Sequence, residues 1–335
     1  MRTTLCDMLG IEYPIIQAPM GGAAGPQLAG AVSSAGGLGT LPLSWQDSSE
    51  LRQAVRETKS LTDKPFAVNL ILEFPQEERL ETCLQERVPV ISFFWGVDAQ
   101  LVTRAKAGGA IVMQTVGSVE EAQTAVRCGV DIIVAQGWES GGHVRGSVTT
   151  IALVPAVVDA VGSVPVVAAG GIADGRGLAA ALALGAAGAW IGTRFLMSPE
   201  ATIHQHYRER LIQASASDTV YLKDLFDIGW ADAPHRVLRN KTVDNWEAAG
   251  RPETGKRPGE GDIIATSKSI GPLVRYSCET LPKDAEGDID AISLWAGQGV
   301  GLVKKLQPAA DIVREIHDEA SMILKRLGTM PGQVQ

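Results

Sequence analysis

The stretch "AIVMQTVGSVEEAQTAVRCGVDIIVAQG" at residues 110–137 contains two mainly apolar runs with a helical segment between them. The runs at 110–116 and 131–136 do not alternate with polar residues, which is typical of parallel strands covered on both faces. Between them, Ser118 and Glu121 have the spacing of a helix capping box, and Gly129 stands where a helix would end. The stretch therefore predicts a strand, a helix and a second, parallel strand.

The same order of elements extends over the chain up to residue 193. Further apolar runs lie at 14–18, 38–41, 66–70, 88–94, 165–170 and 188–193, which brings the expected strands to eight. Eight strands alternating with helices favour an α/β fold of the (β/α)8 TIM barrel type over an open sheet. An open dinucleotide-binding sheet would need GxGxxG after its first strand, and the early glycines in "APMGGAAG" (18–25) lack that spacing.

The pattern changes after the last of these strands. Residues 204–226 suggest a helix with one polar side, and residues 240–262 are rich in charge, glycine and proline, as in a loop. The segment "AISLWAGQGVGLVKKL" (291–306) is again apolar with interspersed glycines, like the sequence of the expected barrel. We therefore expect a barrel made of residues 1–215 and 296–335, with a smaller, mostly helical cap or substrate domain at 216–295.

Composition excludes several classes of partner. The 335 residues are 45% hydrophobic and carry a net charge of −8 without a basic stripe, so nucleic acid is not an expected partner. No uninterrupted apolar stretch has membrane-spanning length, and the N-terminal "MRTTLCDMLGIEYP" lacks the apolar core of a secretion signal. The four cysteines form no CxxC pair, which favours reduced thiols and a cytoplasmic location. A homodimer is left open beside a monomer.

Two neighbouring strand ends have the features of a phosphate site. Gly170 and Gly171 follow the seventh strand, and Gly192 and Thr193 end the eighth. In barrels these two loops often bind phosphate, because glycine lets backbone N–H groups approach a ligand. Either pair alone could serve only a tight turn, but both pairs together indicate a phosphate-bearing ligand. Arg194 could reach that phosphate or form a surface ion pair.

Side-chain amides stand at three other strand ends. Asn69, Gln114 and Gln136 each carry a donor and an acceptor, which suits the edge of a flavin ring. The backbone at Met20 and Gly21, in "QAPMGG" (17–22), could approach such a ring edge-on. For any one of the three amides, a strand end facing water is an equal alternative.

A histidine framed by glycines follows the sixth strand, in "QGWESGGHVRG" (136–146). An ordinary imidazole titrates near neutral pH, so His143 could act as a base or, when protonated, attract an anion. The alternative is a surface histidine in a flexible loop. His204 and His206 have metal-like HxH spacing, but no cysteine or carboxylate cluster completes a site, so no metal is expected.

Four of these segments together resemble one enzyme family. "QAPMGG", "VAQGWESGGHVRG", "PVVAAGGIADGRG" and "IGTRF", in this order, are similar to the nitronate monooxygenase family, once called 2-nitropropane dioxygenases. "GQG" at 297–299 resembles a family segment that returns toward the flavin. The same superfamily contains flavin-dependent enoyl-acyl carrier protein reductases and NADH:quinone reductases, which share the Gly-Gly-His element.

The resemblance implies an FMN-bound barrel with His143 as the catalytic base. It implies that the phosphate-binding residues are Gly170, Gly171, Gly192 and Thr193. It also implies that the residues lining the flavin are Met20, Gly21, Asn69, Gln114, Gln136, Gly141, Gly142 and Gln298.

The implied reaction is oxidation of an alkyl nitronate, or of a nitroalkane, by O2 to a carbonyl compound and nitrite. The alternative activity is that of an NAD(P)H-dependent flavin reductase acting on enoyl thioesters or quinones. A non-catalytic barrel that binds a phosphate ligand is a third hypothesis.

Overall fold

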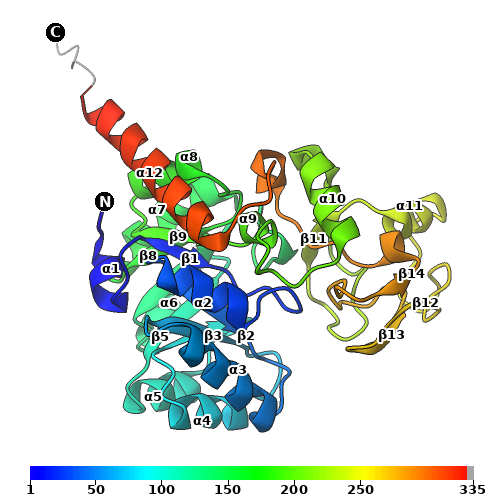
Figure 1. The fold of residues 1–335 in the computed structure, drawn as a ribbon, viewed down its shortest axis with the longest axis horizontal. Coiled ribbons are helices and arrows are strands. Elements are labelled where there is room, and N and C mark those ends of the chain that lie inside the picture. Colours follow the sequence, from blue (N-terminus) through cyan, green and yellow to red (C-terminus); the bar gives the residue numbers. More distant parts are fainter. Residues whose placement is uncertain (330–335) are drawn as a thin grey trace.

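Eight parallel strands form a closed barrel in the computed structural model, which describes residues 1–329 (Figure 1). In spatial order they are β1 (Ile15–Gln17), β9 (Gly188–Ile191), β8 (Val166–Ala169), β6 (Ile132–Gln136), β5 (Ile111–Val116), β4 (Val90–Phe94), β3 (Phe66–Ile71) and β2 (Gly39–Pro42). The ring closes between β1 and β2, where Leu38 N donates to Ile15 O and Gln17 N donates to Leu38 O, both at 2.9 Å. All eight predicted strands are present, and the (β/α)8 barrel is confirmed.

Helices fill the connections between the strands and surround the barrel. In chain order they are α2 (Pro26–Ser34), α3 (Ser48–Leu61), α4 (Glu77–Gln85), α5 (Ala99–Ala107), α6 (Val119–Arg127), α7 (Thr150–Val161) and α8 (Gly175–Ala183), followed by the short α9 (Thr193–Leu196). The start of α6 shows how local sequence sets these boundaries: Ser118 Oγ accepts from Glu121 N at 3.2 Å, and the Glu121 carboxylate accepts from Gly117 N at 2.7 Å. Within residues 1–329, no helix is both long enough and apolar enough to cross a bilayer.

Both faces of the barrel strands are buried, which explains their unbroken apolar runs. Inside the barrel, side chains such as Ile16, Met113 and Trp190 pack together with Leu5 and Leu9 from α1 (Thr4–Leu9). On the outside, a second core joins the strands to α3, α4, α5 and α7. Burial on two sides favours apolar residues at most positions of these strands.

The chain returns to the barrel after the cap, as expected. The 3-10 helix η3 (Gln298–Leu302) leads to α12 (Ala309–Gly328), whose Ile312, Val313 and Ile316 share one core with α2 and α8. Figure 1 shows α12 in red beside α8. The last six residues of the predicted barrel segment, 330–335, lie outside the described residues.

The cap is not mostly helical, so this part of the prediction is wrong. The predicted helix at 204–226 ends early, as α10 (Gln205–Gln213). Residues 216–295 contain the strands β10 (Thr219–Leu222), β11 (His235–Leu238), β12 (Ile263–Ser267), β13 (Gly271–Val274) and β14 (Glu286–Gly287), the helix α11 (Lys241–Ala248) and the 3-10 helices η1 (Ala216–Asp218) and η2 (Ile289–Ala291).

Pairing between distant segments explains the error. β10 pairs antiparallel with β11, and β11 pairs with the two-residue strand β7 (Gly142–His143), which comes from the barrel loop. Such pairings depend on distant partners, so local propensity does not reveal them. The cap forms a lobe at one side of the barrel in Figure 1. The division at residues 215 and 296 stays a prediction.

Candidate active site

The loop after β6 carries His143 to the barrel mouth, and two glycines shape it. Gly142 has a φ of 73°, a left-handed backbone that favours glycine. Gly141 has no room for a side chain, because a Cβ there would lie 2.3 Å from Gly297 N. The two glycines therefore serve a turn and a close contact between two backbones. That contact gives Gly141 a reason to be glycine that differs from the expected approach to a ring.

Gln136, at the end of β6, holds this loop in place. Its Nε2 donates to His143 O at 3.0 Å, and its Oε1 accepts from Arg145 N at 2.9 Å. The amide expected at a flavin edge is thus turned toward the loop. It has one N–H and one lone pair left for a ligand.

Aromatic rings surround the His143 side chain. Its ring centroid lies 3.9 Å from that of Trp230, 5.3 Å from that of Trp295 and 6.0 Å from that of Trp95. The first two tryptophans belong to the cap, and Trp95 follows β4 of the barrel. The cap and the barrel therefore meet at the predicted catalytic residue.

Hydrogen bonds determine which nitrogen of His143 carries the proton. Its Nδ1 lies 3.2 Å from Ala233 O, and because a carbonyl oxygen only accepts, Nδ1 is the donor. His235 shares that acceptor through Nδ1 at 2.9 Å, while its Nε2 accepts from Phe226 N at 3.2 Å. Both imidazoles are consistent with the neutral form. His143 Nε2 is left with a lone pair.

The surroundings also keep His143 neutral. Burial against the tryptophans, together with the nearby His235, lowers the pKa of His143 to about 3. The bond to Ala233 O acts in the opposite direction but is the smallest of these effects on the pKa. Burial likewise lowers the pKa of His235. This differs from the expected imidazole that titrates near neutral pH, because the sequence did not reveal the cap residues that cover the ring.

The two predicted phosphate loops lie side by side, because β8 and β9 are neighbours in the barrel. Gly170 and Gly171 have φ values of 107° and 71°, so both turns require glycine. At the end of β9, a Cβ on Gly192 would stay 3.6 Å from Ala18 Cβ and 3.8 Å from Met20 Sδ, which is ordinary contact distance. Met20 therefore lies beside Gly192, and the first and eighth strands meet as predicted.

The segment 297–299 joins these loops to the His143 loop. Gly297 N donates to Thr193 Oγ1 at 3.0 Å, and Gln298 N donates to Glu139 O at 2.9 Å. A Cβ on Gly299 would lie 2.9 Å from Gly171 O. Five of the predicted site residues thus come together here: Gly141, Gly171, Gly192, Thr193 and Gln298.

Arg194 contacts the segment before α12. It is buried, and its guanidinium donates to Lys305 O at 3.2 Å and to Gln307 Oε1 at 2.6 Å. The side chain is therefore bound to the segment before α12, and it forms no surface ion pair with any of residues 1–329; its reach to a phosphate stays a prediction.

The amides of β3 and β5 point to opposite sides of the barrel wall. Asn69 lies on the same strand face as Ala67, which packs inside the barrel, and its Oδ1 accepts from Ser92 Oγ at 3.1 Å. Gln114 lies between Val112 and Val116, which pack in the core between strands and helices. Strand alternation turns Gln114 to that outer side, and its contact with the flavin stays a prediction.

Two hydroxyls that the sequence did not single out also lie among the site residues. Thr40 Oγ1, on β2, and Ser140 Oγ, in the His143 loop, are buried without a hydrogen-bond partner in residues 1–329. A Cβ on Gly170 would lie 2.7 Å from Ser140 Oγ, so this hydroxyl lies directly at the predicted phosphate loop. A buried unpaired hydroxyl costs about 1–3 kcal/mol, and a polar ligand would remove that cost. The hydroxyls and the left-handed glycines fit a flavin with a phosphate group.

Gly21 lies near the cap side of the mouth, where a Cβ would be 3.6 Å from the Trp45 ring. Trp45 is 47% exposed and contacts Phe74 and Trp230 at centroid distances of 5.9 and 6.4 Å. An aromatic path therefore runs from the surface to the ring that covers His143.

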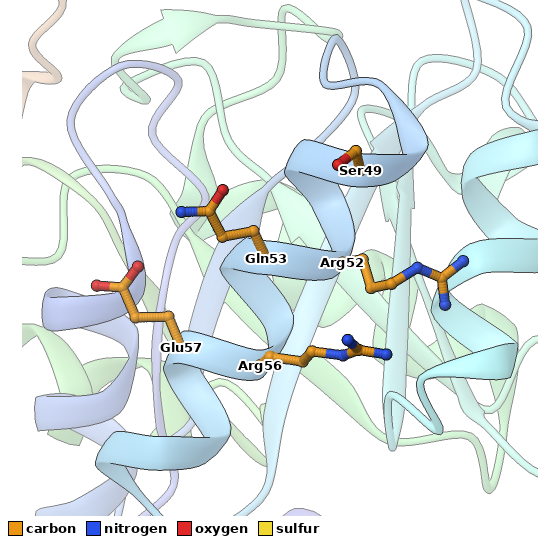
Figure 2. Close-up of a pocket in the computed structure, with 5 residues that line it drawn as sticks. All are labelled: Ser49, Arg52, Gln53, Arg56 and Glu57. Atoms are coloured by element: carbon orange, nitrogen blue, oxygen red, sulfur yellow. The ribbon is translucent and has the colours of Figure 1, made fainter.

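The pocket on α3 in Figure 2 is separate from this site. It is lined by Ser49, Arg52, Gln53, Arg56 and Glu57. Figure 2 shows both arginines directed away from Gln53 and Glu57, and each binds Glu86 at 2.8 Å. These ion pairs link α3 to the end of α4 and account for both arginine side chains.

The histidines with HxH spacing have other contacts. His204 caps α10 by accepting from His206 N at 3.0 Å, and His206 Nε2 lies 3.3 Å from Asp290. In the part of the chain that the structure describes, no three His, Cys, Asp or Glu side chains form a group that could hold a metal ion.

Comparison with known proteins agrees with this geometry. The family model described as nitronate monooxygenase matches residues 2–78 and 72–319. The nitronate monooxygenase of Pseudomonas aeruginosa is 34% identical over 95% of this chain and 99% of its own. A (3aS,4S,5R,7aS)-5-hydroxy-7a-methyl-1-oxo-octahydro-1H-indene-4-carboxyl-CoA dehydrogenase of Rhodococcus jostii is 33% identical over 98% and 99%. The structure of FabK from Thermotoga maritima aligns with a TM-score of 0.81 at 34% identity, covering 98% of this chain and 99% of that one.

These matches extend over the barrel and most of the cap, so they include both parts of the site. The relatives are flavin-dependent enzymes of one barrel superfamily. The chain is an enzyme, an oxidoreductase, and it belongs to the nitronate monooxygenase family.

Proposed function

We propose that this chain is an FMN-dependent nitronate monooxygenase, which oxidises an alkyl nitronate with O2 to a carbonyl compound and nitrite. The observation that carries the proposal is the neutral imidazole of His143 against the tryptophan rings. A base with a pKa of about 3 is poorly matched to removing a proton from a carbon acid near neutral pH. A nitronate has already lost that proton, so it is the substrate that suits such a site.

The residues of the mouth divide the remaining work. The glycines and the threonine at the ends of β8 and β9 would hold the FMN phosphate, and Asn69 would face the ring. When bound, FMN supplies the electron-accepting centre that O2 reoxidises. His143 would take no proton from the substrate, and the tryptophans would exclude water from the reacting carbon.

Anaerobic mixing tests the proposal. The purified holoprotein is mixed with propyl-2-nitronate, and in parallel with NADH or NADPH, while the flavin absorbance is followed. We expect rapid bleaching by the nitronate alone, and nitrite release once O2 is admitted. Fast bleaching by a pyridine nucleotide, with none by the nitronate, would contradict the proposal and support the NAD(P)H-dependent reductase. Release of the flavin by heat and its mass determine whether the cofactor is FMN.

A second candidate is oxidation of a bulky acyl-CoA substrate. The specific observation in its favour is the wall of three indole rings around His143, which could contact a large apolar carbon skeleton. The similarity to the Rhodococcus jostii CoA dehydrogenase is in line with it. The same anaerobic assay with hydroxyacyl-CoA substrates separates the two, because only this candidate predicts bleaching by the thioester.

A further inference from the structure

Trp230 covers His143 and carries a polar atom without a partner. The side chain is 4% exposed, and its ring lies 3.9 Å from His143, 4.9 Å from Trp95 and 5.7 Å from Phe74, centroid to centroid. Its indole Nε1 is buried and has no acceptor among residues 1–329. Of the three tryptophans around His143, Trp230 alone combines these two properties within the described chain.

A buried indole without an acceptor is costly, because indole N–H can only donate. Trp246, elsewhere in the cap, shows the ordinary arrangement: its Nε1 donates to Pro252 O at 2.8 Å. The unsatisfied donor of Trp230 lies instead beside the predicted catalytic residue. The protein is therefore preorganised for an acceptor that a ligand would bring.

The proposed nitronate substrate carries such an acceptor, because its oxygens share a negative charge. His143 and His235 are neutral, and the lone pair at His143 Nε2 cannot donate to an oxygen. Arg145 pairs with Glu121 at 2.7 Å, and the buried Arg236 donates to Trp138 O at 3.0 Å. The buried Trp230 N–H has no acceptor among residues 1–329, and it would be free to donate to an anionic oxygen of the substrate.

Ring spacing determines where such an oxygen could lie. A planar substrate between two stacked rings needs a separation of about 7 Å, twice a contact distance of about 3.5 Å. The centroids of His143 and Trp230 are only 3.9 Å apart, so no substrate fits between them. The face of Trp230 toward His143 is therefore closed to a substrate. A substrate that accepts from the indole N–H meets Trp230 at its edge, because this N–H lies in the plane of the ring.

We propose that the Trp230 indole N–H donates a hydrogen bond to an anionic oxygen of the substrate, and that Trp230 thereby selects small carbon oxyanions such as nitronates and carboxylates. This inference rests on the proposed function for the identity of the true substrate. Its binding component can be measured independently of turnover.

The test compares Trp230→Phe with Trp246→Phe in the holoprotein. Titration with butyrate, a non-reacting carboxylate, is followed by the change in the flavin spectrum. The Kd should rise about 10- to 100-fold in Trp230→Phe, the range for a lost hydrogen bond to a charged group. In Trp246→Phe it should stay within about threefold, because that N–H is bonded inside the cap. The value of kcat/KM for propyl-2-nitronate should fall by the same factor as the affinity for butyrate.

Two outcomes would overturn the inference: equal Kd values in the two variants, or a Trp230→Phe protein that binds butyrate like the wild type. If Trp230→Phe does not fold, replacing Trp230 with 3-benzothienylalanine keeps the ring shape and removes only the donor, and the same comparison applies. Failure of the wild type to oxidise any nitronate would refute the proposed function, whereas the butyrate titration would still decide the role of Trp230.

Discussion

Acidification should destabilise this protein through His143, and the size of the effect tests the neutral imidazole. The unfolded chain has a histidine pKa of about 6.5, whereas the pKa in the folded protein is about 3. As the pH falls below about 6.5, His143 binds a proton in the unfolded state but not in the folded state. Stability is therefore lost progressively until the pH reaches about 3.

The magnitude follows from these two values. Between about pH 7.5 and about pH 5, linkage predicts a loss of about 2 kcal/mol from His143 alone. His235 adds a loss of the same sign, because burial lowers its pKa as well. The contribution of His143 is a sizeable part of the total stability of a natural protein.

The assay is urea unfolding at both pH values for the wild type and for His143→Gln, whose amide can still donate to Ala233 O. We expect the variant to lose about 2 kcal/mol less than the wild type on acidification. In parallel, the NMR signal of the His143 ring should not titrate between about pH 5 and about pH 8. A ring signal with a midpoint near pH 6.5, or an unchanged pH dependence in the variant, would refute the reasoning and restore His143 as a general base.

Three further predictions concern the cofactor loops and the cap. Gly171→Val should release the flavin on dialysis, measured by absorbance of the protein, because its φ of 71° strains a branched residue directly at the predicted phosphate loop. Gly250→Val, with a φ of 84° and open space around it, should be similarly strained but keep its flavin on dialysis. Gln136→Leu should keep its flavin and lose about 10- to 100-fold in kcat, since the loop that it holds would shift. Arg257→Met should lower the free energy of unfolding by about 3–5 kcal/mol in urea, because it leaves two carboxylates in the cap without their buried cation.

The barrel could be predicted because each of its strands and helices is specified locally. The apolar run of β5, the capping residues of α6 and the apolar run of β6 lie next to one another in the chain, and each signals its own element. The cap sheet has no such local signal. Thr219–Leu222 becomes a strand because His235–Leu238 lies against it, and β11 in turn fixes the two residues of β7. The helical pattern at residues 204–226 gave no information about the pairing of β10 with β11 or of β11 with β7.

The same division applies to the site. The left-handed turn at the end of β8 could be predicted, because such a turn leaves a visible pair of glycines in the sequence, Gly170 and Gly171. The direction of Gln114 could also have been inferred from the sequence, because the apolar Val112 and Val116 flank it at the spacing of one strand face. Ser140 was missed because a serine hydroxyl becomes a candidate ligand contact only when the structure shows that it is buried without a hydrogen-bond partner.

The chemistry of His143 depends on residues far from its own motif. The Gly-Gly-His element places an imidazole at the barrel mouth, but an imidazole there could be a base, a cation or a neutral acceptor. Trp230, Trp295 and the carbonyl of Ala233 make it a neutral acceptor here, and all three belong to the segment after the barrel's eighth strand. Enzymes that share the motif can therefore differ in reaction if their caps differ. It follows that the substrate of a barrel with this motif has to be inferred from the cap residues that contact the histidine, because the loop that carries the histidine is compatible with several reactions.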